Sequence, residues 1–496
     1  MSDKQKVRIP LTRYEWPDER LERIKKRRRV YTLVLALVLS FGLGFTVKTA
    51  LTPVSPVVSV SEGTEFDRLK AVYQVLINDW YFGKDLNDLD QQLINSAILG
   101  MVEATGDPHT AYMTADEVKA FTEAIDRGFV GIGVSYFDSN GSYIVDRVFM
   151  DSPAAKAGVQ PGDIIYKVDG VDVTGIGSDV LVDMVRGEED TVVGIDFIRG
   201  NETVHLDITR GPINNTAYGE MVDKDTAYLE ISQFGSSTAE EVKTYLETFK
   251  TAQAQNIIID VRNDGGGYLT ALEDIGSLLV PKDEILIQQD TRDGERIVSK
   301  SKGNVVLSFD KIVVLVNENT ASAAEVLTAA LKEDMSATVV GVKTYGKGTV
   351  QQQQPFSDGA SLKYTVAQWL TPSGETIHKI GITPDVVVEQ HPIMTRGFTQ
   401  LKDDEAYTLD QVHTSIQDVQ IALDFLGYTV DRQDGYYSQK TFEALTQYQS
   451  EKGLTQDGLV TKSLLESLAS EVVRVWHQER DTKDLQRIEA LKIVNE

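Results

Sequence analysis

Residues 312–333 read IVVLVNENTASAAEVLTAALKE and contain, in order, the patterns of a buried strand, a turn and a helix. Ile312–Val316 is a near-continuous run of β-branched and aliphatic residues, which is typical of a strand covered on both faces. A similar run, Ile257–Val261, precedes it, and a turn and a helical pattern follow each run. This alternation predicts an α/β core over residues 212–391.

The turn after the second strand, Asn317–Glu325, places a serine where a helix begins. Asn319 or Thr320 can cap this helix, so we expect Ser322 in its first turn. Unpaired N–H groups and the helix dipole favour negative charge there. Ser322 is therefore a candidate nucleophile, and the N–H of Ala323 is a candidate oxyanion donor. On this pattern alone, a serine at a helix start is more often a simple cap.

A serine nucleophile needs a base, and the histidines do not supply one. The chain has 6 histidines and no Gly-x-Ser-x-Gly motif with a matching histidine. A lysine that burial keeps neutral is the alternative. Lys347 is the candidate, because Gly346 and Gly348 let the backbone approach closely and can thread the side chain into a pocket. Without further support, an exposed lysine in a glycine turn is the simpler interpretation.

Three motifs in the same order resemble those of the carboxyl-terminal processing proteases. They are DVRNDGGGYL (260–269), NENTASAAE (317–325) and GKGTVQ (346–351), and Lys347 lies 25 positions after Ser322. The resemblance covers about residues 65–390. It implies that Ser322 is the nucleophile, that Lys347 is the general base and that Gln351 orients the lysine.

The same resemblance places a second oxyanion donor in the glycine turn, at Gly266 or its neighbour Gly267, with Arg262 and Asn263 bracing the turn. Two positions depart from the family pattern, and neither touches the dyad. Gly265 stands where a proline is common, and Ala324 stands where a serine is often found. The implied reaction is acyl transfer through an acyl-enzyme, without a metal or a cofactor.

Residues 126–211 change to short β-rich runs separated by glycines. Pro153 predicts the start of a short helix, Gly158 its end, and Ile164–Val168 a strand. This region resembles a PDZ domain, which implies a β-sandwich-like fold.

PDZ domains bind a peptide's terminal carboxylate in a glycine-rich loop while the peptide adds a strand to the sheet edge. The resemblance places this loop at Phe129, Val130, Gly131, Ile132 and Gly133. Arg186, after the second expected helix, is a candidate sensor of the bound peptide, although a lone arginine is more often a solvated surface residue.

The N-terminal part predicts a membrane anchor. Val30–Val47 has 18 residues without a charge, about the minimum for a bilayer-spanning helix, and Arg27–Arg29 precede it. The positive-inside rule gives a cytoplasmic segment 1–29, an anchor 30–48 and a single-pass cell-membrane protein with the remainder outside. A cleaved signal peptide competes, but a cut after Ala50 would put Lys48 where a small residue is preferred.

Flanking regions complete the multidomain α+β plan. Residues 49–62 are expected to be a linker and residues 63–125 a helical arm, which can serve as a spacer, a cap or a homodimer contact. After a linker at 392–408, residues 409–470 resemble the three-helix peptidoglycan-binding domain, with Phe442, Leu445, Tyr448 and Leu459 as packing positions. Residues 471–496 are a charged, helix-prone tail.

Charge and composition limit the other functions. The net charge is −26, and residues beyond 48 carry −33 of formal charge, which disfavours nucleic-acid binding. There are 0 cysteines and no histidine pair with metal-ligand spacing.

The sequence therefore predicts a membrane-anchored serine endopeptidase that binds proteins or peptides by their C-termini, with peptidoglycan as a further partner. Two alternatives remain. One is a non-catalytic adaptor that combines a PDZ domain with a wall-binding module, and the other is a related α/β fold with crotonase-like acyl-thioester chemistry.

Overall fold

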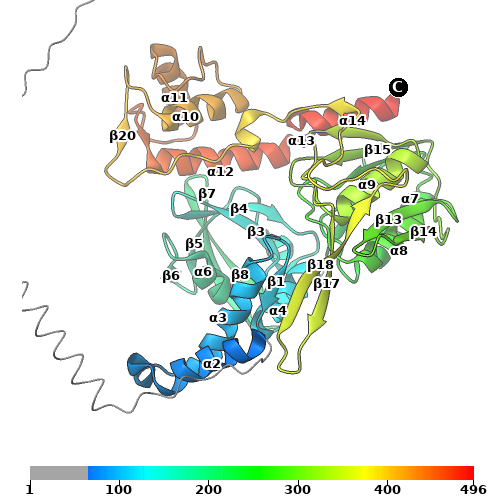
Figure 1. Cartoon of the computed structure of the whole chain (residues 1–496). Helices are drawn as coiled ribbons and strands as arrows, with labels where there is room; N and C mark the ends of the chain where they lie inside the picture. Colours follow the sequence, from blue (N-terminus) through cyan, green and yellow to red (C-terminus); the bar gives the residue numbers. More distant parts are fainter. Residues whose placement is uncertain (1–64, 127, 214) are drawn as a thin grey trace, which may run out of the picture. The chain divides into compact units, whose positions relative to one another are not determined.

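The computed structural model describes residues 65–126, 128–213 and 215–496 (Figure 1). The predicted segment 1–29, anchor 30–48 and linker 49–62 lie outside these residues. Among the described residues, no helix combines the length and apolarity needed to cross a bilayer. The chain divides into two units, residues 1–98 and 99–496.

The helical pattern predicted after residue 65 is confirmed. Large apolar side chains remain exposed on these helices, including Phe66 at 73%, Tyr81 at 69% and Phe82 at 61%. The elements are α2 (Glu65–Asn78), the 3₁₀ helix η1 (Tyr81–Asp85) and α3 (Leu89–Glu103).

The predicted PDZ region forms a six-stranded antiparallel sheet in the order β3-β4-β5-β7-β8, with β6 paired to β5. The first and last strands of this region, β2 and β9, pair with each other in a separate two-stranded sheet. The helix expected at Pro153 is α5, which Ser152 caps and Gly158 ends with φ +89°. The elements are β2 (Phe129–Gly131), β3 (Val134–Ser139), β4 (Ser142–Val148), α5 (Pro153–Ala157), β5 (Ile164–Val168), β6 (Val171–Asp172), α6 (Ser178–Val185), β7 (Val192–Arg199), β8 (Glu202–Thr209) and β9 (Gly211–Ile213).

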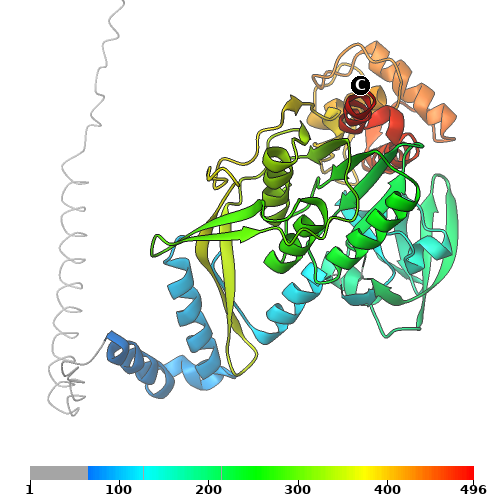
Figure 2. The same ribbon diagram turned by 90° about the vertical axis from the view of Figure 1, so that its right-hand side faces the viewer.

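The α/β core contains a six-stranded sheet in the order β10-β11-β12-β15-β16-β19, parallel except for the β10–β11 pair. Its strands are β10 (Ala217–Met221), β11 (Thr226–Ile231), β12 (Asn256–Asp260), β15 (Lys311–Val316), β16 (Thr338–Gly341) and β19 (Val386–Val387). Figure 2 shows the helices of the core beside this sheet. They are α7 (Thr238–Thr251), α8 (Leu269–Leu279) and α9 (Ala323–Asp334).

Both faces of this sheet are covered, as the strand composition predicts. Ile257, Ile259 and Val314 pack with α7, α8 and α9. Ile258 and Val313 point to the opposite face and pack with the final helix, α14 (Leu485–Asn495), which lies beside β15 in Figure 1. The helix-prone tail thus supplies a cover for the sheet.

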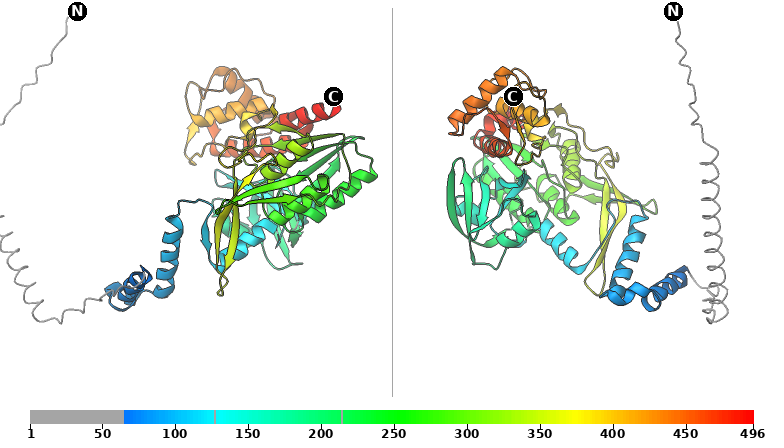
Figure 3. Two further views of the ribbon diagram at one scale, coloured as in Figure 1. Left: turned by 45° about the vertical axis from the view of Figure 1, so that its right-hand side comes forward. Right: turned by 90° about the vertical axis from the view of Figure 1, so that its left-hand side faces the viewer.

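A second sheet continues the core in the order β1-β18-β13-β14, with β17 also paired to β18. Figure 3 shows β17 and β18 as a long hairpin. The remaining elements of this part are β1 (Ala111–Met113), α4 (Ala115–Asp126), β13 (Ile285–Thr291), β14 (Arg296–Lys300), β17 (Thr349–Pro355) and β18 (Ser361–Leu370).

The C-terminal module has the three helices that the sequence predicts, although two details differ. Val460 is fully buried, whereas the adjacent Leu459 is half-buried, because Val460 follows the tight turn at Gly458 into the core. The expected linker 392–408 packs on the module through Ile393 and Leu401. The elements are η2 (Pro392–Met394), β20 (Ala406–Tyr407), α10 (Thr414–Phe425), α11 (Gln439–Glu451), β21 (Val460–Thr461), α12 (Lys462–Gln478) and α13 (Arg480–Lys483).

Candidate active site

Ser322 is itself the N-cap of α9, so the expectation of a cap at Asn319 or Thr320 is wrong. Thr320 is unavailable as a cap because its hydroxyl donates to the carbonyl of Val261 at 2.9 Å and accepts the N–H of Asn317 at 3.0 Å. The backbone of Ser322 has φ 57° and ψ −120°. Such a conformation costs about 1–3 kcal/mol for a residue with a side chain and is typical of functional sites.

Gly266 lies directly against Ser322. Its φ is +93°, and a Cβ atom on it would lie 2.7 Å from the Cβ of Ser322 and 2.8 Å from the amide nitrogen of Ala323. Gly267 is equally confined, because its Cβ would lie 2.2 Å from the carbonyl oxygen of Phe234. Gly266 therefore brings the backbone of the glycine turn into close contact with the start of α9. The N–H of Gly266 donates to Oδ1 of Asp264 at 2.8 Å in this conformation.

Asn263 connects the glycine turn to the serine turn. Its N–H donates to Oδ1 of Asn317 at 2.9 Å. Its own Oδ1 accepts from the Nδ2 atoms of Asn317 at 2.8 Å and Asn319 at 2.9 Å. Arg262, by contrast, directs its guanidinium to Asp260 and to Asp484 of the C-terminal tail.

Glu325, which was not a predicted site residue, joins the serine turn to the lysine loop. This fully buried carboxylate accepts the N–H of Ser322 at 2.9 Å and the N–H of Lys347 at 2.9 Å. It also accepts the N–H of Gly346 at 2.7 Å and the hydroxyl of Thr344 at 2.5 Å. Burial raises the pKa of Glu325, and these four bonds oppose that rise. An acidic residue in the first turn of a helix fits the helix dipole, so the residue type and position of Glu325 do not indicate this second role.

Lys347 is half-buried, between Gly346 and Gly348. Burial lowers the pKa of its amine, and the charge of Lys363 lowers it further, while Glu325 acts in the opposite direction. A Cβ on Gly348 would lie 2.2 Å from the backbone nitrogen of His378, so this glycine permits the close approach that the sequence predicts. The environment favours the neutral amine that a general base requires.

Gln351 is the third residue of β17 and directly follows the register shift between Val350 and Gln351 in the pairing with β18. Its Nε2 donates to the hydroxyl oxygen of Thr349 at 2.8 Å and to that of Thr365 at 3.4 Å. Within the described residues, no hydrogen bond joins Gln351 to Lys347, and none joins the side chains of Lys347 and Ser322. The side chain of Glu325 joins the two loops, and the N–H of Tyr345 adds a bond to the carbonyl of Thr320 at 3.0 Å.

The predicted carboxylate loop leads into the edge strand of the PDZ sheet. Phe129–Gly131 pairs with β9, and β3 begins just after Gly133 at the edge of the sheet. The guanidinium of Arg186 lies 4.6 Å from the ring centroid of Phe129 and 3.8 Å from Glu123 of α4. The candidate sensor therefore contacts the loop and a helix outside the PDZ region.

Comparison with known proteins extends this picture. The model of peptidase family S41 matches residues 225–388, a PDZ-domain model matches residues 144–199, and the putative peptidoglycan-binding domain matches residues 412–468. A probable CtpA-like serine protease of Staphylococcus haemolyticus is 31% identical over 93% of this chain and 93% of its own. The carboxy-terminal processing protease CtpA of Bacillus subtilis is 33% identical over 88% of this chain and 92% of its own.

The chain belongs to the carboxyl-terminal processing proteases of peptidase family S41. It is a serine-type peptidase with a PDZ domain and a peptidoglycan-binding domain. Among solved structures, the photosystem II D1 C-terminal processing protease is similar, with 26% identity, a TM-score of 0.42 and coverage of 65% of this chain and 92% of that one.

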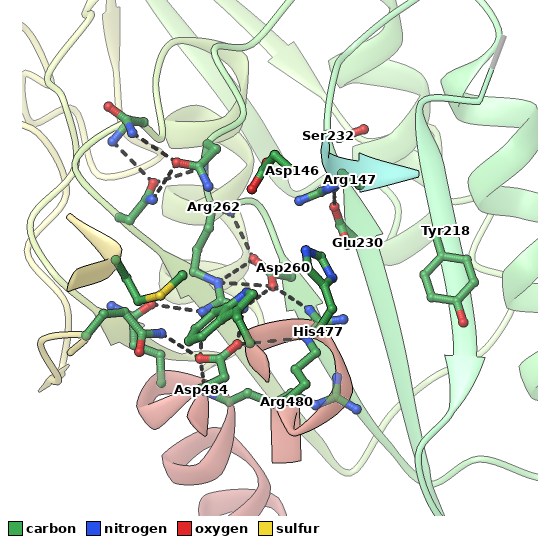
Figure 4. Close-up of a pocket in the computed structure, with 18 of the residues that line it drawn as sticks. Asp146, Arg147, Tyr218, Glu230, Ser232, Asp260, Arg262, His477, Arg480 and Asp484 are labelled. Atoms are coloured by element: carbon green, nitrogen blue, oxygen red, sulfur yellow. Dashed lines mark hydrogen bonds and ion pairs between the residues drawn. The ribbon is translucent and has the colours of Figure 1, made fainter. Parts of the chain in front are cut away.

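This S41 protease also contains a polar cavity of about 1240 Å³ at the carboxyl ends of β12 and β15 (Figure 4). The described residues that line it include Arg262 and Asn319 but neither Ser322 nor Lys347. Its arginines are engaged in ion pairs. Arg147 of β4 pairs with Glu230, and Arg480 of α13 lies 3.6 Å from Asp260. We interpret this cavity as a junction between the PDZ domain, the core and the C-terminal segment.

Proposed function

We propose that this S41 protease is a membrane-anchored, extracytoplasmic endopeptidase that binds substrate C-termini through its PDZ domain and cleaves them with a Ser322–Lys347 dyad. The main support for the dyad is the buried carboxylate of Glu325. It accepts the backbone N–H groups of both Ser322 and Lys347 and so joins the two residues in one hydrogen-bonded unit. Lowering of the Lys347 pKa by burial supports its role as the base.

In the proposed reaction, the amine of Lys347 accepts the hydroxyl proton of Ser322 while Oγ attacks the peptide carbonyl carbon. The carbonyl oxygen gains the negative charge, and the N–H groups of Ala323 and the glycine turn stabilise it. Collapse of the intermediate breaks the C–N bond, and the protonated lysine returns the proton to the leaving amine. Water then hydrolyses the acyl-enzyme with Lys347 as base, and no cofactor takes part.

The glycine turn needs one rearrangement before it can stabilise the oxyanion through Gly266. The N–H of Gly266 is bonded to Asp264, so that bond must break before the donor turns to substrate. We assign the trigger to a peptide C-terminus bound at Phe129–Gly133 and along β3, with Arg186 as the sensor. A ligand can drive this change only if it binds the rearranged state more tightly.

Substitution of the dyad tests the chemistry. Ser322→Ala and Lys347→Ala should each abolish cleavage of a reporter peptide while far-UV circular dichroism and the thermal transition stay close to wild type. Lys343→Ala is the matched control, because Lys343 is an exposed lysine in the same loop. Full activity of either dyad variant would refute the proposal and would leave the non-catalytic adaptor as the better explanation.

A pair of peptides tests the PDZ role. A free C-terminal peptide should raise kcat for an unrelated reporter substrate, whereas the same peptide with an amidated C-terminus should not, because the loop recognises the carboxylate. Equal effects of the two peptides would contradict this part of the proposal.

The expected location and assembly complete the proposal. We propose a cell-membrane location with the protease outside, and wall attachment through residues 409–470. Exposed Phe66, Tyr81 and Phe82 support self-association of the arm. Fractionation of cells into membrane and soluble parts, a pull-down with insoluble peptidoglycan, and light scattering test location, wall binding and oligomeric state, respectively.

A further inference from the structure

The side chain of Arg262 is only 10% exposed, and its guanidinium is fully engaged in hydrogen bonds. Its Nε and Nη2 donate to Asp260 at 2.9 and 2.6 Å. From the other side, Nη1 and Nη2 donate to Asp484 at 2.9 and 2.8 Å, and Nη1 also donates to Gln486 at 3.1 Å. Figure 4 shows the guanidinium between the two carboxylates, one from the core and one from the C-terminal segment. Such paired, bidentate bonds fix the position of the whole guanidinium.

Asp484 is held as firmly as the arginine that it binds. Its side chain is fully buried, caps α14 by accepting the N–H of Arg487 at 3.0 Å, and accepts Nε2 of Gln390 at 2.6 Å. Burial raises the pKa of Asp484, but the charge of Arg262, the hydrogen bonds from its guanidinium and the N–H of Arg487 together outweigh burial and hold the pKa below its usual value. The carboxylate is therefore ionised at neutral pH and is pre-oriented toward Arg262.

The position of Arg262 determines what this pairing can do. Arg262 directly precedes Asn263, which bonds the serine turn, and it stands four residues before Gly266, which lies against Ser322. A displacement of Arg262 would therefore move the backbone that carries the proposed oxyanion donor. Displacements of about 1 Å at remote positions can cost about 10²-fold in rate.

We propose that Asp484 is a positioning residue for peptide hydrolysis, acting through Arg262 to hold the glycine turn against Ser322. Asp484 lies outside the stretches that match the peptidase and peptidoglycan-binding models, residues 225–388 and 412–468. It follows α12 of the wall-binding module by six residues. This inference rests on the proposed role of Gly266.

Asp484 is not needed merely to hold α14 on the sheet, because other contacts in this segment already do so. α14 is anchored on the sheet by Ala490 and Val494, and Asn256 Nδ2 donates to the carbonyl of Val494 at 3.3 Å. Loss of the Asp484 charge should therefore leave α14 docked.

The test compares Asp484→Asn with Asp481→Asn in the full-length protein. Asp481 is the matched control, because it lies in the same segment and pairs with another arginine, Arg487, at 3.0 Å, but its side chain is 71% exposed. With a reporter peptide, Asp484→Asn should lower kcat by about 10²-fold and leave KM within about twofold. Asp481→Asn should keep both constants within about twofold.

A double variant separates positioning from folding. If Asp484 acts through Arg262, Asp484→Asn should cause no further loss of kcat in an Arg262→Gln background. An equal additional loss in that background, or a loss that matches the unfolded fraction in circular dichroism, would overturn the inference. If Asp484→Asn does not fold, Arg262→Lys replaces it, because it keeps the charge and removes the bidentate bonds. Wild-type kcat in Arg262→Lys, or in folded Asp484→Asn, would also overturn it.

The two proposals can fail separately. Full activity of Ser322→Ala would remove the dyad and this inference with it. Inactive Ser322→Ala together with fully active Asp484→Asn would remove only the inference.

Discussion

Gly265 and Gly266 offer a direct comparison at the residue scale. Gly266→Ala would place a Cβ 2.7 Å from the Cβ of Ser322 at a φ of +93°, whereas Gly265→Ala would meet nothing within 4 Å. We expect Gly266→Ala to lower kcat by about 10²–10³-fold, the cost of losing one oxyanion donor, and Gly265→Ala to stay near wild type. Steady-state assays of both variants check this. Similar activity of the two would mean that the glycine turn does not act on Ser322.

Lys363 offers a test through pH. Its positive charge lowers the pKa of Lys347, so Lys363→Gln should raise that pKa. Because the base form of Lys347 is the neutral amine, the rising limb of kcat/KM against pH should move to higher pH. Lys402→Gln, at a lysine that is 82% exposed, is the control and should leave the limb in place. A limb that moves to lower pH, or stays unchanged in Lys363→Gln, would exclude Lys347 as the titrating base.

At the residue scale, the sequence motifs predicted which residues form the site but not which residues they contact. The serine and lysine loops could be predicted because their glycines and helix start leave a local pattern. The clamp at Glu325 could not, since it depends on where the chain returns 21 and 22 residues later. The same holds for Arg262, whose partner lies 222 positions away.

At the element scale, α14 should contribute to the stability of the catalytic core. Val494 is 2% exposed on the sheet face, and Val494→Ala removes two methyl groups at about 0.8 kcal/mol each, plus a cavity cost. We expect a loss of about 2 kcal/mol in unfolding free energy, against less than about 0.5 kcal/mol for Lys492→Ala, whose side chain is 60% exposed. Urea unfolding followed by core tryptophan fluorescence measures both. Equal midpoints would show that the tail does not stabilise the core.

The elements themselves were largely predictable, because strand composition and helix periodicity are local. The start of α9 was not, since Thr320 uses its hydroxyl within the turn and leaves the cap to Ser322. Residues 392–408 were predicted to be a linker, but their apolar residues Ile393 and Leu401 pack on the folded module, a contact that no local pattern indicates.

At the scale of the whole molecule, α12 contacts the PDZ domain as well as its own module. The hydroxyl of Ser470 donates to the carbonyl of Gly162 at 2.5 Å, and a Cβ on Gly162 would lie 2.6 Å from the carbonyl oxygen of Ser470. Gly162→Ala should therefore loosen α12, giving faster amide hydrogen exchange around residue 470. Gly158→Ala is the control, because its φ of +89° matches the +88° of Gly162 but nothing lies within 4 Å. Equal exchange in the two variants would contradict a specific contact.

The docking of α14 has a consequence for biosynthesis. The buried cluster on the sheet face formed by Tyr228, Ile258 and Val313 is covered by α14, which contributes Ala490 and Val494, with Leu491 and Ile493 packed against it. The ribosome must therefore synthesise the chain as far as residue 494 before this apolar face can be buried. Until then one apolar face of the sheet stays exposed to water, although the PDZ domain and all strands of the sheet have already been synthesised.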